Sequence, residues 1–293
     1  MTHTVEKIGG TSMSHLHQLR DTLFLKDGAP RYGRIFVVSA FGGITNCLLE
    51  HKKTQETGVY AAFSNAEDDH GWHHALSRVS AAMIDAHQTV LDHPGDIEQA
   101  TSFVQDRIEG ARNCLIDLQR LCSYGHFRVS AHLMQIRELL SGLGEAHSAY
   151  VTTLLLQRAG VNARFVDLSG WRDEGDLSLH ERLEGALAGI NPSSEMPIVT
   201  GYAQCREGLM REYDRGYSEV TFSQLAALTG AREAIIHKEF HLSSADPELV
   251  GGDTVRTLGQ TNYDVADQMA NLGMEAIHPS AAKNLFKISN PVK

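Results

Sequence analysis

Short apolar runs rich in β-branched residues alternate along this chain with stretches of helical spacing, and this alternation limits the fold more than any other feature. The runs occupy residues 4–8, 34–39, 163–168, 197–202 and 234–237, and they read as buried strands. Helical spacing covers, among others, residues 145–159, 222–229 and 264–272. The pattern predicts an α/β fold with a mostly parallel central sheet, and such sheets bind ligands beyond the carboxyl ends of their strands.

The stretch from about residue 47 to residue 140 departs from this alternation. It contains few strand candidates, and apolar residues such as Leu76, Val79 and Met83 follow helical spacing. We predict a helical insertion or lid here, and a plain helical subdomain without a catalytic role is the alternative. The Pro- and Ser-rich stretch 192–197 is the best candidate for a hinge between two halves of the chain.

Composition narrows the class of protein. The chain has 293 residues, of which 42% are hydrophobic and 21% charged, as is ordinary for a globular protein of one large domain or two small ones. No apolar run approaches the roughly 18 residues of a membrane span, so we expect no membrane association. The net charge of −10 argues against a nucleic-acid surface. The four cysteines form no CxxC pair, which favours a reducing, cytoplasmic location.

Sixteen histidines raise the possibility of a metal site. The candidate pairs are His73/His74, His126/His132 and His237/His241. Only the last pair has the i, i+4 spacing of helical ligands, and no cysteine lies near it in the sequence. We therefore predict no protein-held metal site.

A turn that could hold phosphate follows the first predicted strand. Lys7 stands near the strand end, Gly9 and Gly10 come next, and Thr11 and Ser12 begin the expected helix. Glycines allow close approach to a ligand, helix-start N–H groups favour anions, and the lysine adds a full positive charge. The spacing is neither a Walker A loop nor a dinucleotide fingerprint, so an ordinary strand–helix turn is the alternative.

Three more segments gather polar groups near expected strand or helix ends. Ser39 and Thr45 bracket a second turn with two glycines. Residues 141–145 read as the end of one helix and the start of another, which would place Glu145 in a first turn. Residues 215–219 precede another expected helix, and their arginine could hold a carboxylate through two parallel hydrogen bonds. Capped helices with solvated side chains are the alternative for the last two.

Together these groups suit an α-amino acid and a phosphate. Arg215 would take the α-carboxylate, and Glu145 and Glu219 would surround the ammonium group. Lys7 and the glycine turns would take the phosphate.

Seven motifs occur in the order seen in aspartate kinases, and the chain resembles that family over essentially its whole length. The motifs occupy residues 7–12, 37–46, 144–149, 199–202, 215–219, 245–247 and 277–279. The pattern is most similar to the aspartate kinases found with ectoine-synthesis genes. The chain ends where the family's ACT-type regulatory domains usually begin, so we expect it to correspond to the catalytic domain, with these domains either naturally absent or cut off.

The resemblance implies a three-layer αβα sandwich and one catalytic domain over residues 1–293. Residues 1–195 would form the amino-acid lobe, including the helical insertion, and residues 196–293 the nucleotide lobe. Lys7 would be the transition-state lysine, and Arg215 and Glu219 would complete the catalytic set. The implied aspartate-site residues are Ser39, Thr45, Glu145, Arg215 and Ser218. The implied phosphate and nucleotide residues are Lys7, Gly9, Gly10, Thr11, Ser12, Lys238, Glu239, Ser243 and Asp246.

The implied activity is ATP-dependent phosphorylation of the β-carboxylate of L-aspartate, with ATP and Mg²⁺ as cofactors and a homodimer as the assembly. This is the first step of aspartate-family amino-acid biosynthesis and, in the subgroup, of ectoine biosynthesis. The nucleophile has an ordinary pKa of about 3.9 and needs no general base at neutral pH.

Several substitutions depart from the family pattern in the nucleotide half. His237, Lys238 and Glu239 replace Trp-Thr-Asp, Ser243 replaces tyrosine, and Glu248 and Glu275 stand where the family has cations. These changes would weaken phosphate binding, and they support the alternative of a weakened, regulatory amino-acid-binding paralogue. A kinase for another acidic amino acid is a second alternative, which Glu145 disfavours because an N-acetylated substrate has no ammonium group.

Overall fold

The apolar runs form one sheet because strands that are buried on both faces must pair laterally and be covered by helices. A computed structural model describes residues 3–238 apart from 52, 53, 55, 66–69, 174, 214 and 215. Its strands are β1 (Thr4–Ile8), β2 (Arg34–Val38), β3 (Ala163–Val166), β4 (Met196–Thr200) and β5 (Glu233–His237). They pair in parallel in the order β3-β4-β2-β1-β5, which confirms the predicted parallel sheet.

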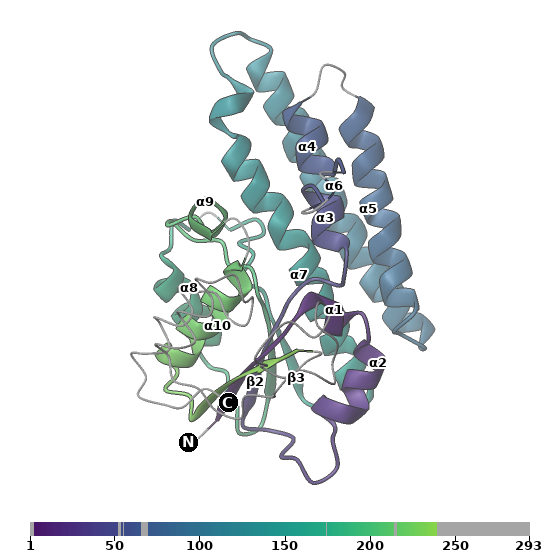
Figure 1. Ribbon diagram of the computed structural model, residues 1–293, viewed down its shortest axis with the longest axis vertical. Coiled ribbons are helices and arrows are strands. Elements are labelled where there is room, and N and C mark those ends of the chain that lie inside the picture. Colours follow the sequence, from purple (N-terminus) through teal and green to yellow (C-terminus); the bar gives the residue numbers. More distant parts are fainter. Residues whose placement is uncertain are drawn as a thin grey trace, which may run out of the picture.

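Helices cover both faces of the sheet and make three layers. Helix α7 (Leu133–Arg158) packs against β3 and β4, and α10 (Tyr217–Leu228) packs against β1, β2 and β5. Figure 1 shows α10 and α8 (Leu179–Leu187) on one side and α7, α1 (Gly10–Met13) and α2 (Leu16–Leu19) on the other. A π-helical turn (Arg20–Phe24) follows α2, and α9 (Leu209–Tyr213) precedes α10. The predicted αβα sandwich is therefore confirmed.

A helical bundle rises beyond one edge of the sheet, where the sequence predicts an insertion. It contains α3 (Ile44–Leu48), α4 (Val59–Ser64), α5 (His70–Gln88), α6 (Pro94–Cys122), a 3₁₀ turn (Val129–Ala131) and the first half of α7. Figure 1 shows that its long helices project away from the strands. Within the described part of the chain, no helix is both long enough and apolar enough to cross a bilayer. The predicted lobe boundary at residues 195 and 196 stays a prediction.

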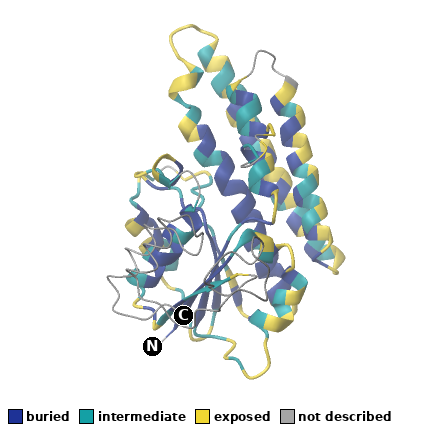
Figure 2. Ribbon diagram, viewed as in Figure 1, coloured by how far each residue is buried: buried dark blue, intermediate teal, exposed yellow. Residues whose placement is uncertain are grey.

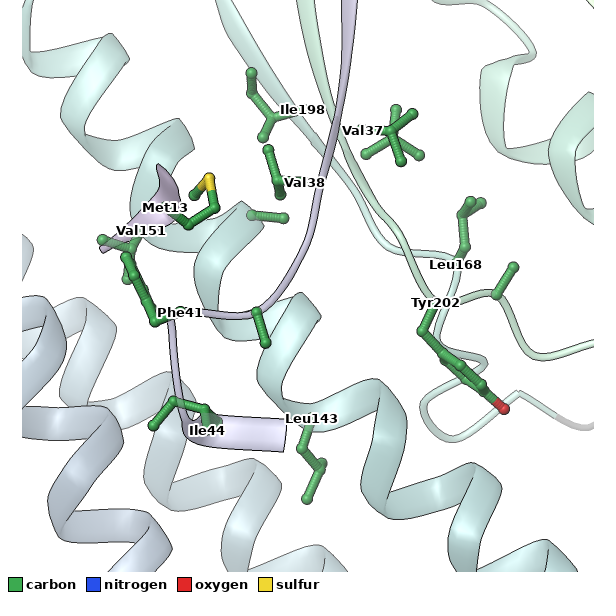
Figure 3. Packing of buried hydrophobic residues seen from close by; sticks show 14 of the residues in the cluster. Met13, Val37, Val38, Phe41, Ile44, Leu143, Val151, Leu168, Ile198 and Tyr202 are labelled. Atoms are coloured by element: carbon green, nitrogen blue, oxygen red, sulfur yellow. The ribbon is translucent and has the colours of Figure 1, made fainter. Parts of the chain in front are cut away.

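The main core lies where α7 crosses the sheet (Figure 2). Val38 of β2 lies beside Ile198 of β4, Val37 points to the opposite side of the strand, and Phe41 and Leu143 extend the packing toward the bundle (Figure 3). The second half of α7 is buried almost all round, as expected for a helix between a sheet and a helical bundle.

One prediction about α7 is wrong. Residues 141–145 do not divide two helices, because α7 continues through them and places Glu145 in its middle. Gly142 and Gly144 allow close packing here: a Cβ on Gly142 would lie 3.1 Å from the Tyr202 ring, and one on Gly144 would lie 2.9 Å from the Ala40 Cβ. Close contact with neighbouring segments therefore explains these glycines.

Candidate active site

The carboxyl ends of β1, β2 and β4 bring the predicted turns to one edge of the sheet. Lys7 pairs in register with Val37, and Val38 pairs with Thr200, so these three strands end side by side. The end of α1, which follows β1, and the turn after β2 are also joined, because the Gly42 amide donates to Ser14 Oγ over 3.0 Å. This is the edge at which a parallel sheet binds ligands.

Lys7 places a buried ammonium group at this edge. The residue is only 6% exposed, and its Nζ lies 3.4 Å from Oε1 of Glu219 in the first turn of α10. The distance exceeds the usual length of a charge-assisted hydrogen bond, so the contact is loose. Lys7 and Glu219, which the sequence assigned to different groups of the ligands, are therefore neighbours across two elements.

Glu145 supplies a buried carboxylate to the same site. The Ser218 hydroxyl donates to Glu145 Oε1 over 2.7 Å, and the Ser39 hydroxyl lies 3.5 Å from Ser218 Oγ. Glu145 Oε2 is buried and makes no hydrogen bond of normal geometry with the described residues. Burial raises the pKa of the Glu145 carboxyl to about 8, although Ser218, Lys7 and the backbone amides of Tyr202 and Ala40 oppose the rise.

Gly201, which directly follows β4, leaves the space that this cluster needs. A Cβ on Gly201 would lie 2.7 Å from the Ser218 Cβ and 2.8 Å from Glu145 Oε2. Gly201 lies in one of the seven motifs, but the sequence does not indicate a role for it. The atoms that exclude a side chain at this position belong to segments distant in the sequence. The same holds for Ser148, whose hydroxyl donates to the Ser39 carbonyl over 2.8 Å and fixes the second turn on α7.

The structure brings together five of the predicted site residues and places others around them. Lys7, Ser39, Glu145, Ser218 and Glu219 form the cluster. Gly9 directly precedes α1, Gly10, Thr11 and Ser12 lie within it, and Thr45 lies in the first turn of α3. Lys238 is exposed directly after β5, the neighbour of β1. Arg215, Glu239, Ser243 and Asp246 lie outside the described residues.

The arrangement can hold a molecule of mixed charge. An amino acid's ammonium group carries three N–H donors and would satisfy the unpaired Glu145 oxygen. Lys7 could hold an anion within the same site. Its electrostatic attraction to that anion would be strong, because Lys7 and Glu145 are both shielded from water. Among the described residues, no three His, Cys, Asp or Glu side chains gather as metal ligands.

Comparisons with known proteins agree with the architecture. A model of the amino acid kinase family matches residues 3–290. The aspartate kinase Ask_Ect of Stutzerimonas stutzeri strain A1501 is 55% identical over 285 residues, which are 97% of this chain and 60% of that protein. Aspartokinase 2 of Arabidopsis thaliana, a chloroplast protein, is 23% identical over 94% of this chain and 48% of its own length.

Solved structures show the same fold. Escherichia coli aspartokinase III, in a complex with aspartate and ADP, superimposes with a TM-score of 0.70 at 18% identity, over 99% of this chain and 61% of that one. This chain thus spans about three fifths of the length of these two bacterial proteins. With its family match over nearly every residue, the chain belongs to the amino acid kinase family.

Proposed function

We propose that this protein is an aspartate kinase that transfers the γ-phosphoryl group of ATP to the β-carboxylate of L-aspartate. The observation that carries the proposal is the buried Glu145 carboxylate, whose second oxygen has no hydrogen-bond partner among the described residues, in one site with the Lys7 ammonium group. The 55% identity to a protein named aspartate kinase supports the choice of substrate.

In this proposal the amino acid is held by its two α-substituents. Glu145 receives the ammonium group, and Ser39, Thr45 and Ser218 complete the pocket around it. Arg215 takes the α-carboxylate through paired hydrogen bonds, which would leave the β-carboxylate facing Lys7. An ammonium ion beside Glu145 favours its ionised form, so substrate binding would draw the carboxyl pKa back down.

The phosphate groups of ATP are assigned to Lys7 and to the turn that follows β1. Lys7 would contact the phosphoryl group in transfer, while Gly9, Gly10, Thr11 and Ser12 lie in the adjacent turn. Lys238, Glu239, Ser243 and Asp246 complete the proposed nucleotide set. The residues fit a magnesium nucleotide, because Mg²⁺ keeps several waters and needs only one or two carboxylates besides the substrate phosphates, and Glu219 could supply a carboxylate beside Lys7.

The reaction then needs little beyond positioning and charge. An oxygen of the ionised β-carboxylate attacks the γ-phosphorus, and the bond from that phosphorus to the ADP oxygen breaks. No proton has to be removed from the nucleophile at neutral pH. Lys7 stabilises negative charge on the oxygens of the migrating group, and bound Mg²⁺ supplies further charge neutralisation.

The remaining biological assignments belong to the same proposal. They are a homodimeric assembly, a cytoplasmic location and a place at the first step of aspartate-family amino-acid or ectoine synthesis.

A hydroxylamine-trapping assay tests the activity directly. We expect hydroxamate from L-aspartate with ATP–Mg²⁺, and much less from L-glutamate or N-acetyl-L-glutamate. Absence of hydroxamate, combined with calorimetric binding of aspartate but not of ATP–Mg²⁺, would instead identify a regulatory amino-acid-binding protein. Product from glutamate in preference to aspartate would reassign the substrate.

A further inference from the structure

One face of α7 holds the segment that connects β4 to α10. Glu138, Gly142 and Glu145 are spaced by four and then three residues, so they lie along one side of the helix. Glu145 meets Ser218 at the start of α10, and Gly142 lies against the Tyr202 ring just after β4. Glu138 is the third member of this row and lies two turns away from Glu145.

Glu138 binds the connecting segment at two places. Tyr202 Oη donates a short hydrogen bond to Glu138 Oε2, and the Met210 amide donates to Oε1 over 2.8 Å. Partial burial raises the pKa of the Glu138 carboxyl, while Tyr202 and the amides of Met210 and Arg211 oppose the rise. Both carboxyl oxygens are therefore used as acceptors, one for each end of the stretch 202–210.

Tyr202 connects this contact to the active site. Its side chain is almost fully buried, and its ring stands edge-on to Tyr217 with the centroids 5.6 Å apart. Tyr217 directly precedes Ser218, whose hydroxyl binds Glu145, and Gly201 directly precedes Tyr202. A shift of the Tyr202 ring would thus disturb Ser218 and Gly201, which both lie against Glu145.

We propose that Glu138 is a positioning residue, which holds residues 202–210 on α7 so that Ser218 meets Glu145 in the geometry that binds the amino acid. The inference rests on the proposed function, because it predicts an effect on aspartate binding. Glu138 acts through Tyr202 and through the backbone at Met210. Among the described residues, it makes no hydrogen bond with Lys7, Ser39, Glu145, Ser218 or Glu219.

Glu138→Gln tests the positioning role with almost no change in size. A glutamine keeps one acceptor oxygen for the Met210 amide, but its NH₂ group can only donate to Tyr202, so the Tyr202 hydroxyl can no longer donate to this position and its hydrogen bond is reversed or lost. We expect KM for aspartate to rise about tenfold, as for loss of a hydrogen bond to a charged group. KM for ATP and kcat should change less than about twofold.

Tyr202→Phe provides a second route to the same contact and removes only the hydroxyl donor. We expect a smaller rise in KM for aspartate, and the double variant should raise KM by less than the product of the two single effects because both changes act on one interaction. Multiplicative effects in the double variant, an unchanged KM for aspartate, or an equal rise in KM for ATP would each overturn the proposal.

Glu50→Gln is the matched control. Glu50 pairs through both carboxyl oxygens with Arg137, the residue next to Glu138 on α7. This variant should lose comparable stability but keep KM for aspartate. If it raised that KM as much as Glu138→Gln does, general destabilisation of α7 would explain both effects and the positioning role would be rejected.

Amide hydrogen exchange separates this inference from the proposed activity. The Met210 amide should exchange at least tenfold faster in Glu138→Ala, which removes its acceptor, than in the wild type, whichever substrate the enzyme uses. If wild-type protein forms no acyl phosphate while this exchange effect is present, the proposed function fails and the contact stands. Unchanged exchange in an active enzyme rejects the positioning role alone.

Discussion

Two buried carboxylates, one within strand β1 and one on α7 at the carboxyl ends of the strands, differ in how many hydrogen-bond partners surround them. Glu6 on β1 accepts hydrogen bonds from Arg34 Nε over 2.7 Å, from the Thr4 hydroxyl over 2.7 Å and from His237 Nε2 over 2.8 Å. Glu145 on α7 has Ser218 on one oxygen and no hydrogen-bond partner on the other among the described residues. Both oxygens of Glu6 thus have hydrogen-bond partners, and we call this carboxylate saturated. One oxygen of Glu145 has no such partner among the described residues, and we call this carboxylate incomplete.

The pKa values record the same difference. Burial alone would raise the pKa of Glu6, but Arg34, His237 and Thr4 lower it to about 2. Burial dominates at Glu145 and raises its pKa to about 8. Polar groups buried without partners cost stability, so an incomplete cluster at a sheet edge points to ligand binding, whereas a complete one points to structural support. Four predictions test this comparison.

The largest expected effect is on stability, from Glu6→Gln. The change leaves the Arg34 guanidinium buried without its anionic partner, and breaking a buried pair costs about 3–5 kcal/mol. Urea denaturation should show this loss in the free energy of unfolding, while KM for aspartate stays within about twofold. A stable variant with impaired aspartate binding would mean that Glu6 belongs to the functional cluster.

The neighbouring residue should behave in the opposite way. Lys7→Ala is expected to lower kcat by about 100-fold or more, because it removes an electrostatic donor to the migrating phosphoryl group. The melting temperature should change little, since the Lys7–Glu219 contact is loose. An unchanged kcat at saturating substrates would remove Lys7 from the proposed mechanism.

The two carboxylates should give stability opposite dependences on pH. The Glu6 contribution is complete above its ordinary pKa of about 4.5 and is lost as pH falls toward 2, because the unfolded chain takes up the proton first. The folded protein keeps the Glu145 proton up to a pKa of about 8, so stability falls as pH rises from about 4.5 to 8.

Melting temperatures of the ligand-free wild type and of Glu145→Gln should expose the second effect. Between pH 5 and pH 9 the wild type should lose a few degrees relative to the variant, because glutamine has no proton to lose. Parallel curves would indicate that Glu145 is already ionised before the substrate binds.

The smallest effect is expected on the exposed face of α6. Arg120 and Asp117 pair over 3.3 Å with side chains about 70% exposed. Such surface pairs contribute little, so Arg120→Ala should change the free energy of unfolding by less than about 0.5 kcal/mol in the same urea titration. A loss similar to that of Glu6→Gln would show that burial does not explain the contrast.

Local pattern was sufficient for the strands and for part of the site. The run 4–8 was predicted as a strand with its observed bounds, because the pattern of short, β-branched apolar segments reflects burial on both faces. Lys7, Ser39 and Glu219 could be named in advance because each lies at or near the end of an element. The helix break before Glu145 was wrong, because Gly142 and Gly144 are also used where helices pack closely.

Glu138 shows why the remainder could not be predicted. In the sequence it is an ordinary carboxylate within a helical stretch, and its partners Tyr202 and Met210 lie 64 and 72 residues away. Gly201 is equally unremarkable until Ser218 and Glu145 are seen on either side of it.

The sequence by itself determined a mostly parallel sheet, a helical stretch before β3 and a lysine near the end of a strand, because these depend on residue periodicity and on neighbours in the chain. Only the tertiary structure decided that Glu145 meets Ser218 across 73 residues. It alone also decided that, within the described part of the chain, both oxygens of Glu6 have hydrogen-bond partners while one oxygen of Glu145 has none. The number of partners that a buried charge finds depends on which elements pack around it, and the pKa and the stability follow from that number.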